Sequence, residues 1–181
     1  MRESDVISKL TSTELSDRNT LSKIRSALEE MVESPDQYIS ILDKDDCHLY
    51  LQGSIDNIEA ISICSTSGFP DLSSGSFYQN LTISLVWVKP SFRGTDYAKE
   101  FVTDVGYHLG REIAEYLEQH PALQMVYLES FAECRNQGGY NCCYWLSQLF
   151  AASFQLSELS ASPLIRSFTT TFPGAEDPAP Y

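Results

Sequence analysis

Basic residues are scarce in this chain: its 181 residues hold 12 lysines and arginines against 25 aspartates and glutamates, giving a net charge of −13. A protein that binds nucleic acid through its backbone needs a basic face to displace counterions from the phosphates, so we expect no nucleic-acid partner. The acidic balance is compatible with a cationic substrate, a basic protein partner or simple solubility.

Long apolar runs are also missing. No stretch approaches the roughly 18 apolar residues of a transmembrane helix, so we expect no membrane span. The first residues, MRESDVISKLTS, lack the apolar core of a signal peptide. The five cysteines are odd in number and show no metal-site spacing, and the three histidines are scattered. We therefore expect reduced cysteines, no bound metal and a cytoplasmic protein.

The chain does carry enough apolar residues for a folded core. Hydrophobic residues make up 43% of it and aromatic residues 12%, which is typical of a globular rather than a disordered protein. A domain of this length buries roughly 70% of its unfolded surface. We expect one domain over residues 1–172, followed by a disordered tail over 173–181 with the sequence PGAEDPAPY.

In the first half of the chain, apolar residues at spacings of three and four predict a helix over 20–33, which Pro35 ends. Three short isoleucine-rich segments then predict an antiparallel meander at 37–42, 47–53 and 58–65. The Gly-, Pro- and Ser-containing segment 66–80 is interpreted as a long mobile loop that overhangs the functional cleft. Residues 81–88 are apolar enough for a central strand.

In the second half, an apolar stripe predicts a helix from Thr95 to about His120, followed by a strand over 124–129. A largely apolar, buried helix follows at 140–154, and 163–172 is a candidate last strand. A strand that feeds a helix and returns to a strand favours parallel pairing of 81–88 with 124–129. The expected fold is therefore α+β, with a mostly antiparallel mixed sheet flanked by helices and one parallel central strand pair.

The segment VWVKPSFRGTDYAKEFV, 86–102, joins the central strand to the long helix. It resembles the cofactor-binding motif of the GNAT N-acetyltransferase superfamily, in which a strand ending in Val-x-Pro leads into an Arg/Gln-x-x-Gly-x-Gly/Ala turn that begins a helix. Val88 and Pro90 match the strand end, Arg93 the first turn position and Ala98 the last, whereas Asp96 stands where the first glycine belongs. The second helix is similar to a later motif of the family, with Asn141 or Cys142 at its start.

The resemblance implies a cosubstrate, acetyl-CoA or another acyl-CoA, whose pyrophosphate accepts hydrogen bonds from unpaired N–H groups at the start of the helix. The residues implied at that site, besides Asn141, are Trp87, Val88, Arg93, Gly94, Thr95, Asp96, Tyr97 and Ala98. Asp96 works against this function, because its carboxylate at ~5 Å and an effective dielectric of ~20 would repel a phosphate charge by roughly 3 kcal/mol. An acidic residue in a first helical turn is equally typical of an ordinary strand-to-helix connection.

Transfer of the acyl group to an amine needs a base, donors to the carbonyl oxygen and an acid for the thiolate. In the family, strands 4 and 5 splay, and a strand-4 N–H binds the carbonyl, which places that donor near Trp87 or Val88. We expect a cleft between Val88 and Glu129, with Glu129 as the candidate base or merely an exposed strand-end acid. The family's acid is a helix tyrosine; Leu149 stands at that position, so Tyr144 or Tyr140 is the candidate substitute.

Two functions remain, and the resemblance makes the first of them the leading expectation. The first is acyl-CoA-dependent transfer to a small or peptidic amine, a cationic one given the surface charge. The second is a catalytically degenerate GNAT-like protein that binds a basic partner protein in an inhibitor or immunity role. The charge of −13, Asp96 and the leucine in place of the tyrosine favour the second. Trp87 and Trp145 are interpreted as core aromatics.

Overall fold

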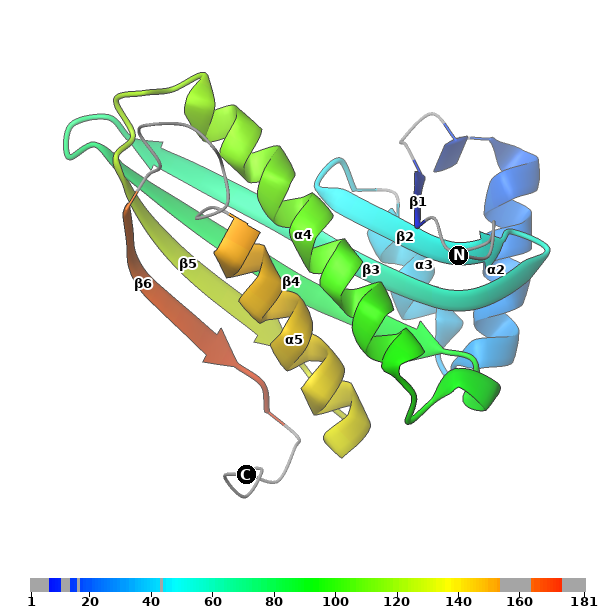
Figure 1. The fold of residues 1–181 in the computed structure, drawn as a ribbon. Helices are drawn as coiled ribbons and strands as arrows, with labels where there is room; N and C mark the ends of the chain where they lie inside the picture. The colour runs from blue at the N-terminus through cyan, green and yellow to red at the C-terminus, as the bar shows by residue number, and fades with distance from the viewer. Residues whose placement is uncertain (1–6, 11–13, 16, 43, 154–163, 174–181) are drawn as a thin grey trace.

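The computed structural model describes residues 7–10, 14–15, 17–42, 44–153 and 164–173 (Figure 1). Its strands form one six-stranded sheet whose spatial order follows the chain order. In sequence, the elements are β1 (Ser8–Leu10), α2 (Arg18–Met31), α3 (Pro35–Leu42), β2 (Cys47–Ser54), β3 (Asn57–Asp71), β4 (Ser76–Val88), η1 (Pro90–Phe92), α4 (Asp96–Glu118), β5 (Met125–Ala132), α5 (Gln137–Ser153) and β6 (Leu164–Thr171).

The strand pairing confirms a mixed, mostly antiparallel sheet. Strands β1 to β4 pair antiparallel in succession. The predicted parallel pair is β4 with β5, and β6 adds a second parallel pair by lying beside β5. Both parallel connections run through a helix, α4 for the first and α5 for the second, as parallel neighbours require.

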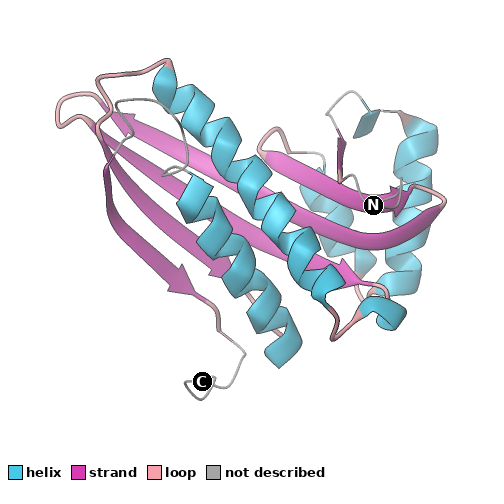
Figure 2. Cartoon of the chain, viewed as in Figure 1, coloured by secondary structure: helices cyan, strands magenta, loops and turns pink. Residues whose placement is uncertain are grey.

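Helices lie on both faces of the sheet (Figure 2). Helices α4 and α5 cover one face, and the apolar side chains between them and the sheet, among them Phe77, Val105 and Phe150, form the larger core. Helices α2 and α3 cover the opposite face at the β1–β3 end, over a second core that includes Ile24, Ile61 and Ile63. Within the described part of the chain, every helix falls short of the length and apolar character that a bilayer crossing requires.

The segment 37–42, predicted as a strand, is instead the greater part of helix α3. Pro35, which was expected only to end the preceding helix, is the first residue of this new one, where its missing N–H costs nothing. Tyr38, Ile39 and Leu42 are the buried residues, a helical spacing of one and four. Six residues are too few to distinguish that spacing from a buried strand by pattern alone.

The prediction of a long mobile loop over the cleft at 66–80 is also wrong. Strand β3 continues to Asp71 and β4 begins at Ser76, so the two form a long hairpin with a short turn. Asp71 holds that turn, accepting hydrogen bonds from Ser73 N–H and Oγ at 3.0 and 2.6 Å. Since β4 runs for twelve residues beyond the turn, the hairpin tip lies about 40 Å from the Val88 end of the strand.

At the ends of the chain, the structure adds one strand and leaves one prediction largely undescribed. Strand β1 was not predicted, because its three residues are too short to show a pattern. The tail expected to be disordered lies outside the described residues except for Pro173, whose carbonyl accepts the Cys134 N–H at 3.0 Å.

Candidate functional site

Strand β4 leaves β5 at a β-bulge. Ile83 pairs with Cys64 of β3 and Leu85 pairs with Ile63, so Ser84 is the extra residue. The parallel pairing with β5 stops at the same place, because its last pair is Ile83 with Ala132. A bulge bends its strand and increases the local twist. Residues 84–88 therefore diverge from β5, as the splay predicted for this strand pair requires.

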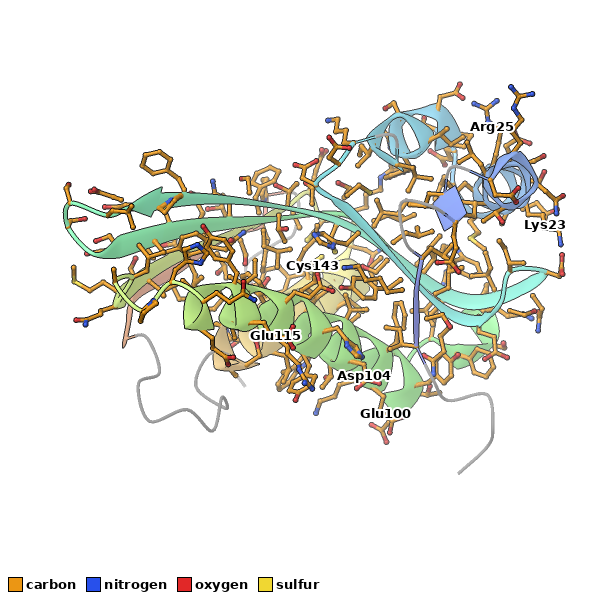
Figure 3. All side chains as sticks on the ribbon, turned by 90° about the horizontal axis from the view of Figure 1, so that it is seen from above. Lys23, Arg25, Glu100, Asp104, Glu115 and Cys143 are labelled. Carbon is orange, nitrogen blue, oxygen red and sulfur yellow. The ribbon has the colours of Figure 1, made fainter. Side chains whose placement is uncertain are left out.

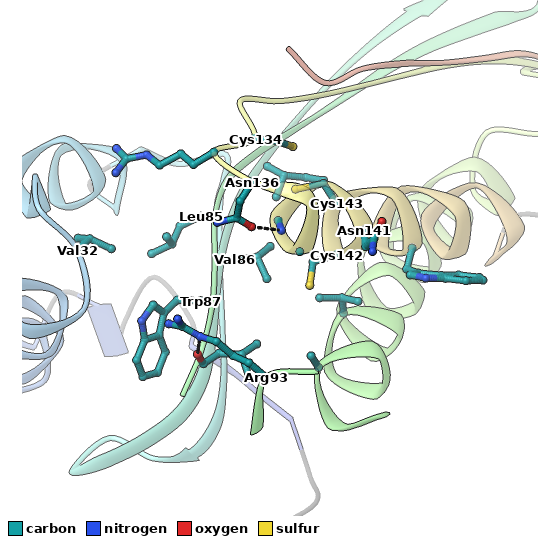
Figure 4. A pocket seen from close by; sticks show the side chains of 18 of the residues that line it. Val32, Leu85, Val86, Trp87, Arg93, Cys134, Asn136, Asn141, Cys142 and Cys143 are labelled. Atoms are coloured by element: carbon teal, nitrogen blue, oxygen red, sulfur yellow. Dashed lines mark hydrogen bonds between the residues drawn. The ribbon is translucent and has the colours of Figure 1, made fainter. Parts of the chain in front are cut away.

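The bulge also changes which side chains face which helices. Up to Ile83, alternate residues of β4 belong to the core under α4 and α5; beyond it, Val86 and Val88 belong to that core. Leu85 and Trp87 pack instead against the α2 and α3 core, as Figure 4 shows for Leu85, Val86 and Trp87. Along the β5 side, residues 84–88 have no strand partner among the described residues, so backbone groups on this edge face the cleft.

A pocket of about 580 Å³ fills this divergence (Figure 4). That volume is within the range of small-molecule sites, roughly 300–1,000 Å³. Its walls are β4 after the bulge, the residues that follow β5, the first turns of α4 and α5, and the end of α2. The pocket thus passes through the plane of the sheet, from the α4 and α5 side to the α2 and α3 side.

The turn before α4 leaves the helix start open. Gly94 has φ +72°, which favours glycine, and no atom lies within 4 Å of the position that its Cβ would take. Thr95 is the N-cap residue, but its hydroxyl donates to the Phe92 carbonyl at 2.6 Å and caps no N–H of the helix. By contrast, Asp17 caps α2 through the Thr20 N–H. Thr95 therefore does not cap α4, and N–H groups at this helix start can donate hydrogen bonds to an anionic ligand.

Arg93 anchors this turn to the strand that precedes it. Its Nε donates to the Val88 carbonyl at 2.8 Å, which closes the connection between β4 and α4. Tyr97 adds a second tie, since its hydroxyl donates to Glu59 of β3 at 2.7 Å and its ring stacks on Phe92 with 4.4 Å between the ring centroids. The helix start is thus held at a fixed position beside the strand end.

Positive charge gathers at the pocket although the chain as a whole is acidic. The charged side chains that line it are the cations Arg93, Lys99 and Arg135 and the carboxylates Glu33 and Glu133. Lys99 lies over the ring of Trp145, 4.4 Å from its centroid, and so joins α4 to α5 at the pocket wall. Trp145, interpreted from the sequence as a core residue, is 39% exposed here.

Helix α5 begins at the pocket too. The Asn136 side chain caps it by accepting the Gly139 N–H at 2.8 Å (Figure 4). Asn141 lies one turn on, where its Oδ1 accepts a hydrogen bond from Gln137 at 3.0 Å. Helices α4 and α5 pack closely enough that a Cβ on Gly106 would stand 2.4 Å from the Leu146 carbonyl oxygen. This close contact fixes the spacing between the middle parts of the two helices, both of which begin at the pocket.

Three cysteines, Cys134, Cys142 and Cys143, line the pocket near the start of α5. Burial raises the pKa of all three thiols, so each is held in the neutral form at pH 7. Such thiols are poor nucleophiles, because the thiolate is the reactive form. Among the described residues, no group of His, Cys, Asp and Glu side chains is arranged to hold a metal ion.

The structure brings most of the cofactor residues expected from the sequence together. Those that line the pocket are Trp87, Val88, Arg93, Gly94, Thr95, Ala98 and Asn141. Asp96 and Tyr97 do not line it: Asp96 is exposed on the first turn of α4, and Tyr97 is turned towards Glu59. The side chain that argued most strongly against an anionic ligand is therefore outside the pocket wall.

The two candidate catalytic residues lie elsewhere. Glu129 pairs in register with Asn80, about 25 Å along the strand from Val88, because the strands diverge only beyond Ala132. The carboxylate at the true point of divergence is Glu133. Tyr144 is 39% exposed and does not line the pocket; its ring contacts those of Tyr140 and Trp145.

Sequence reasoning missed the residues that approach the pocket from the α2 side. Glu33, just after α2, faces Arg135, just after β5, with 3.8 Å between Oε2 and Nη1. Tyr38 of α3 also lines the pocket. No local pattern links these positions, since only the folded sheet places the end of α2 opposite the end of β5.

Comparison with known proteins gives distant likenesses only. No model of a protein family matches the chain, and no curated protein matches its sequence. Solved structures similar to it include an aminoglycoside acetyltransferase from an uncultured soil metagenomic sample, with 13% identity over 68% of this chain and 75% of that one and a TM-score of 0.36. Another is an acetyltransferase from Vibrio fischeri, with 16% identity over 69% and 95% of the two chains and a TM-score of 0.34. A tetramutant of the BH1408 protein from Bacillus halodurans has 15% identity over 68% and 81% and a TM-score of 0.33.

At this level of identity the features of the chain itself carry the resemblance. They are the strand-to-helix turn at 88–98, the parallel β4–β5 pair that splays after a bulge, and the two helices that begin at the splay. The chain therefore has a GNAT-like α+β fold, as its sequence motif predicted.

Proposed function

We propose that the protein binds acyl-CoA in the β4–β5 pocket and transfers the acyl group to an amine. The observation that carries this proposal is the uncapped start of α4 beside an unpaired strand edge. N–H groups at the helix start suit a pyrophosphate, and N–H groups of the strand edge suit an acyl carbonyl oxygen. Gly94, with open space around its Cβ position, lets a phosphate approach the backbone closely.

The charges of the pocket support the same ligand. Arg93 bonds to Val88 through Nε, and within the described part of the chain its Nη groups have no hydrogen-bond partner, so they can donate to a phosphate. Lys99 and Arg135 add positive charge on the walls formed by α4 and by the end of β5. Together with two helix starts, these cations attract the phosphates of coenzyme A in a chain that otherwise repels anions.

In the proposed reaction the ammonium group first releases a proton to water, and the neutral amine nitrogen then attacks the thioester carbonyl carbon. The carbon–sulfur bond breaks, the nitrogen loses a second proton as the amide forms, and the departing sulfur takes up one proton, so that coenzyme A leaves as a thiol. A strand-edge N–H near Trp87 stabilises the oxygen that becomes negative. The amine enters beside Glu133, which lines the pocket just beyond β5 and attracts a cationic acceptor; unlike Glu33, which faces Arg135, it has no ion-pair partner among the described residues. Glu129 and Tyr144 have no role in this proposal, because they lie outside the pocket.

Calorimetric titration with acetyl-CoA tests the proposal. Arg93→Ala should weaken binding about tenfold or more, because a charge-assisted hydrogen bond to phosphate is lost. The matched control is Arg111→Ala, which removes the same charge from an exposed position on α4, away from the pocket, where Arg111 pairs with Glu115 at 3.0 Å. Equal weakening by both variants, or no heat of binding to the wild type, would contradict the proposal.

A specific observation favours a second candidate, a GNAT-like protein that binds without catalysis. The pocket-lining side chains on α4 and α5 include no tyrosine or histidine that could protonate a departing thiolate. In this case acetyl-CoA would bind with no release of free thiol in the presence of any amine. A panel of diamines, amino sugars and lysine peptides, assayed for thiol release, separates the two functions.

A further inference from the structure

A large part of one sheet face is not covered by any described helix. Helices α2 and α3 cover that face only over β1–β3 and the end of β4, whereas the hairpin end of β3 and β4, with β5, is bare (Figures 1 and 3). Residues Val126, Leu128 and Ala132 of β5 pack under α4 and α5. The residues that alternate with them therefore lie on the bare face.

Aromatic side chains gather on this bare face. Phe69 pairs in register with Tyr78, and Tyr78 with Tyr127. The rings of Tyr78 and Tyr127 stack, with centroids 4.9 Å apart. Phe69 is 66% exposed, Tyr78 44% and Phe131, two rows away, 43%. Large aromatics exposed together on one face are typical of an interaction site rather than of a surface that only faces water.

A carboxylate lies between the aromatic rows. Glu129 is exposed and stands between Tyr127 and Phe131 on the same side of β5. The other charged residue described on these rows is Asp71, whose carboxylate is already bonded to Ser73 and Ser74 of the hairpin turn. The described charges of the bare face are therefore negative, and Glu129 is the one that is free to bind a ligand.

We propose that the bare face binds an arginine- or lysine-bearing segment of another protein, independently of the pocket at the other end of β4. A guanidinium or ammonium group placed here pairs with Glu129 while it lies over the faces of Tyr127 or Phe131. Nucleic acid and anionic lipid are repelled by this charge. A second copy of the chain would bring together two molecules of net charge −13 and two copies of Glu129.

Fluorescence anisotropy tests the proposal with a labelled peptide of alternating arginine and serine, compared with a matched glutamate peptide. The arginine peptide should bind the full chain and the glutamate peptide should not. Glu129→Gln should weaken binding about fivefold or more, since it removes a charge-assisted contact. Tyr78→Ser should weaken binding without any change in charge, because it removes a ring of the aromatic row.

The matched control is Glu29→Gln, which removes the same charge from an exposed position on α2, on the covered part of the sheet. It should change binding less than about twofold. Circular dichroism verifies that each variant is folded, and analytical ultracentrifugation gives its oligomeric state. Equal weakening by Glu29→Gln and Glu129→Gln would reduce the effect to net charge and overturn the proposal. So would a lack of arginine-peptide binding, or a wild-type dimer that Tyr78→Ser dissociates.

Discussion

Gly110→Ala tests how closely helices α4 and α5 pack against each other. A Cβ on Gly110 would stand 1.6 Å from Ser153 Oγ and 2.5 Å from the Phe150 carbonyl oxygen. Ser153 cannot turn away without cost, because its hydroxyl donates to that carbonyl at 2.7 Å. Alanine normally stabilises a helix by about 1 kcal/mol relative to glycine. Overpacking against backbone costs about 3 kcal/mol, so the expected net loss of stability is about 2 kcal/mol.

Urea and thermal unfolding measure this loss. In a chain of this size, 2 kcal/mol corresponds to a fall in Tm of about 4–8 °C. The matched control is Gly139→Ala on α5, where the nearest atom to the added Cβ would be an ordinary contact at 3.6 Å; its stability should not fall. Because Gly110→Ala moves α5 away from α4, it should also weaken acetyl-CoA binding. A Gly110→Ala protein as stable as the wild type would show that the helices do not pack this closely.

Three further predictions concern charge and pH. Asp96→Gly should tighten acetyl-CoA binding about fourfold at low salt, since an exposed carboxylate about 5 Å from a phosphate in water costs about 0.8 kcal/mol; calorimetry that shows no change or weaker binding would contradict this. Burial raises the pKa of the Cys64 thiol to about 12, so its proton stabilises the fold fully below pH 9 and this stability is lost as pH rises towards 12. The urea midpoint of Cys64→Ala should therefore fall less steeply than that of the wild type between pH 9 and 11, and parallel curves would refute the assignment. Burial, with the charge of Lys9, lowers the pKa of His48, so the stability that the neutral imidazole contributes is present at pH 7 and is lost as pH falls below the pKa of histidine in the unfolded chain. The stability of His48→Gln should therefore fall less than that of the wild type between pH 7 and 5, and an equal fall in both would contradict this.

The sequence predicted the elements with a long or distinctive pattern. Helix α4 showed its apolar stripe along most of its 23 residues, and the Arg93–Gly94 turn identified the end of β4. Short elements such as α3 carried too few residues for their period to be read. The bulge at Ser84 left no mark in the sequence, because serine there is compatible with a regular strand.

The residues of the candidate site were likewise predicted only where they lie close together in the sequence. Residues of the turn were found because they are contiguous, but Glu33 and Arg135 meet only through the sheet. The sequence pattern places the strand end at Glu129, whereas β5 continues to Ala132 and the divergence begins there. An error of three or four residues in one strand end moved the expected base out of the pocket.

Binding of acetyl-CoA at the start of α4 is tested by the amide chemical shifts of the ¹⁵N-labelled protein, recorded while acetyl-CoA is added. We expect large shifts at the turn and helix start, 94–98, and along the strand edge at 85–88, which is not paired with β5. No shifts are expected at 76–82, where the same strand is paired on both sides. Shifts confined to the hairpin end of the sheet, or saturable binding that leaves 94–98 unmoved, would contradict binding at this helix start.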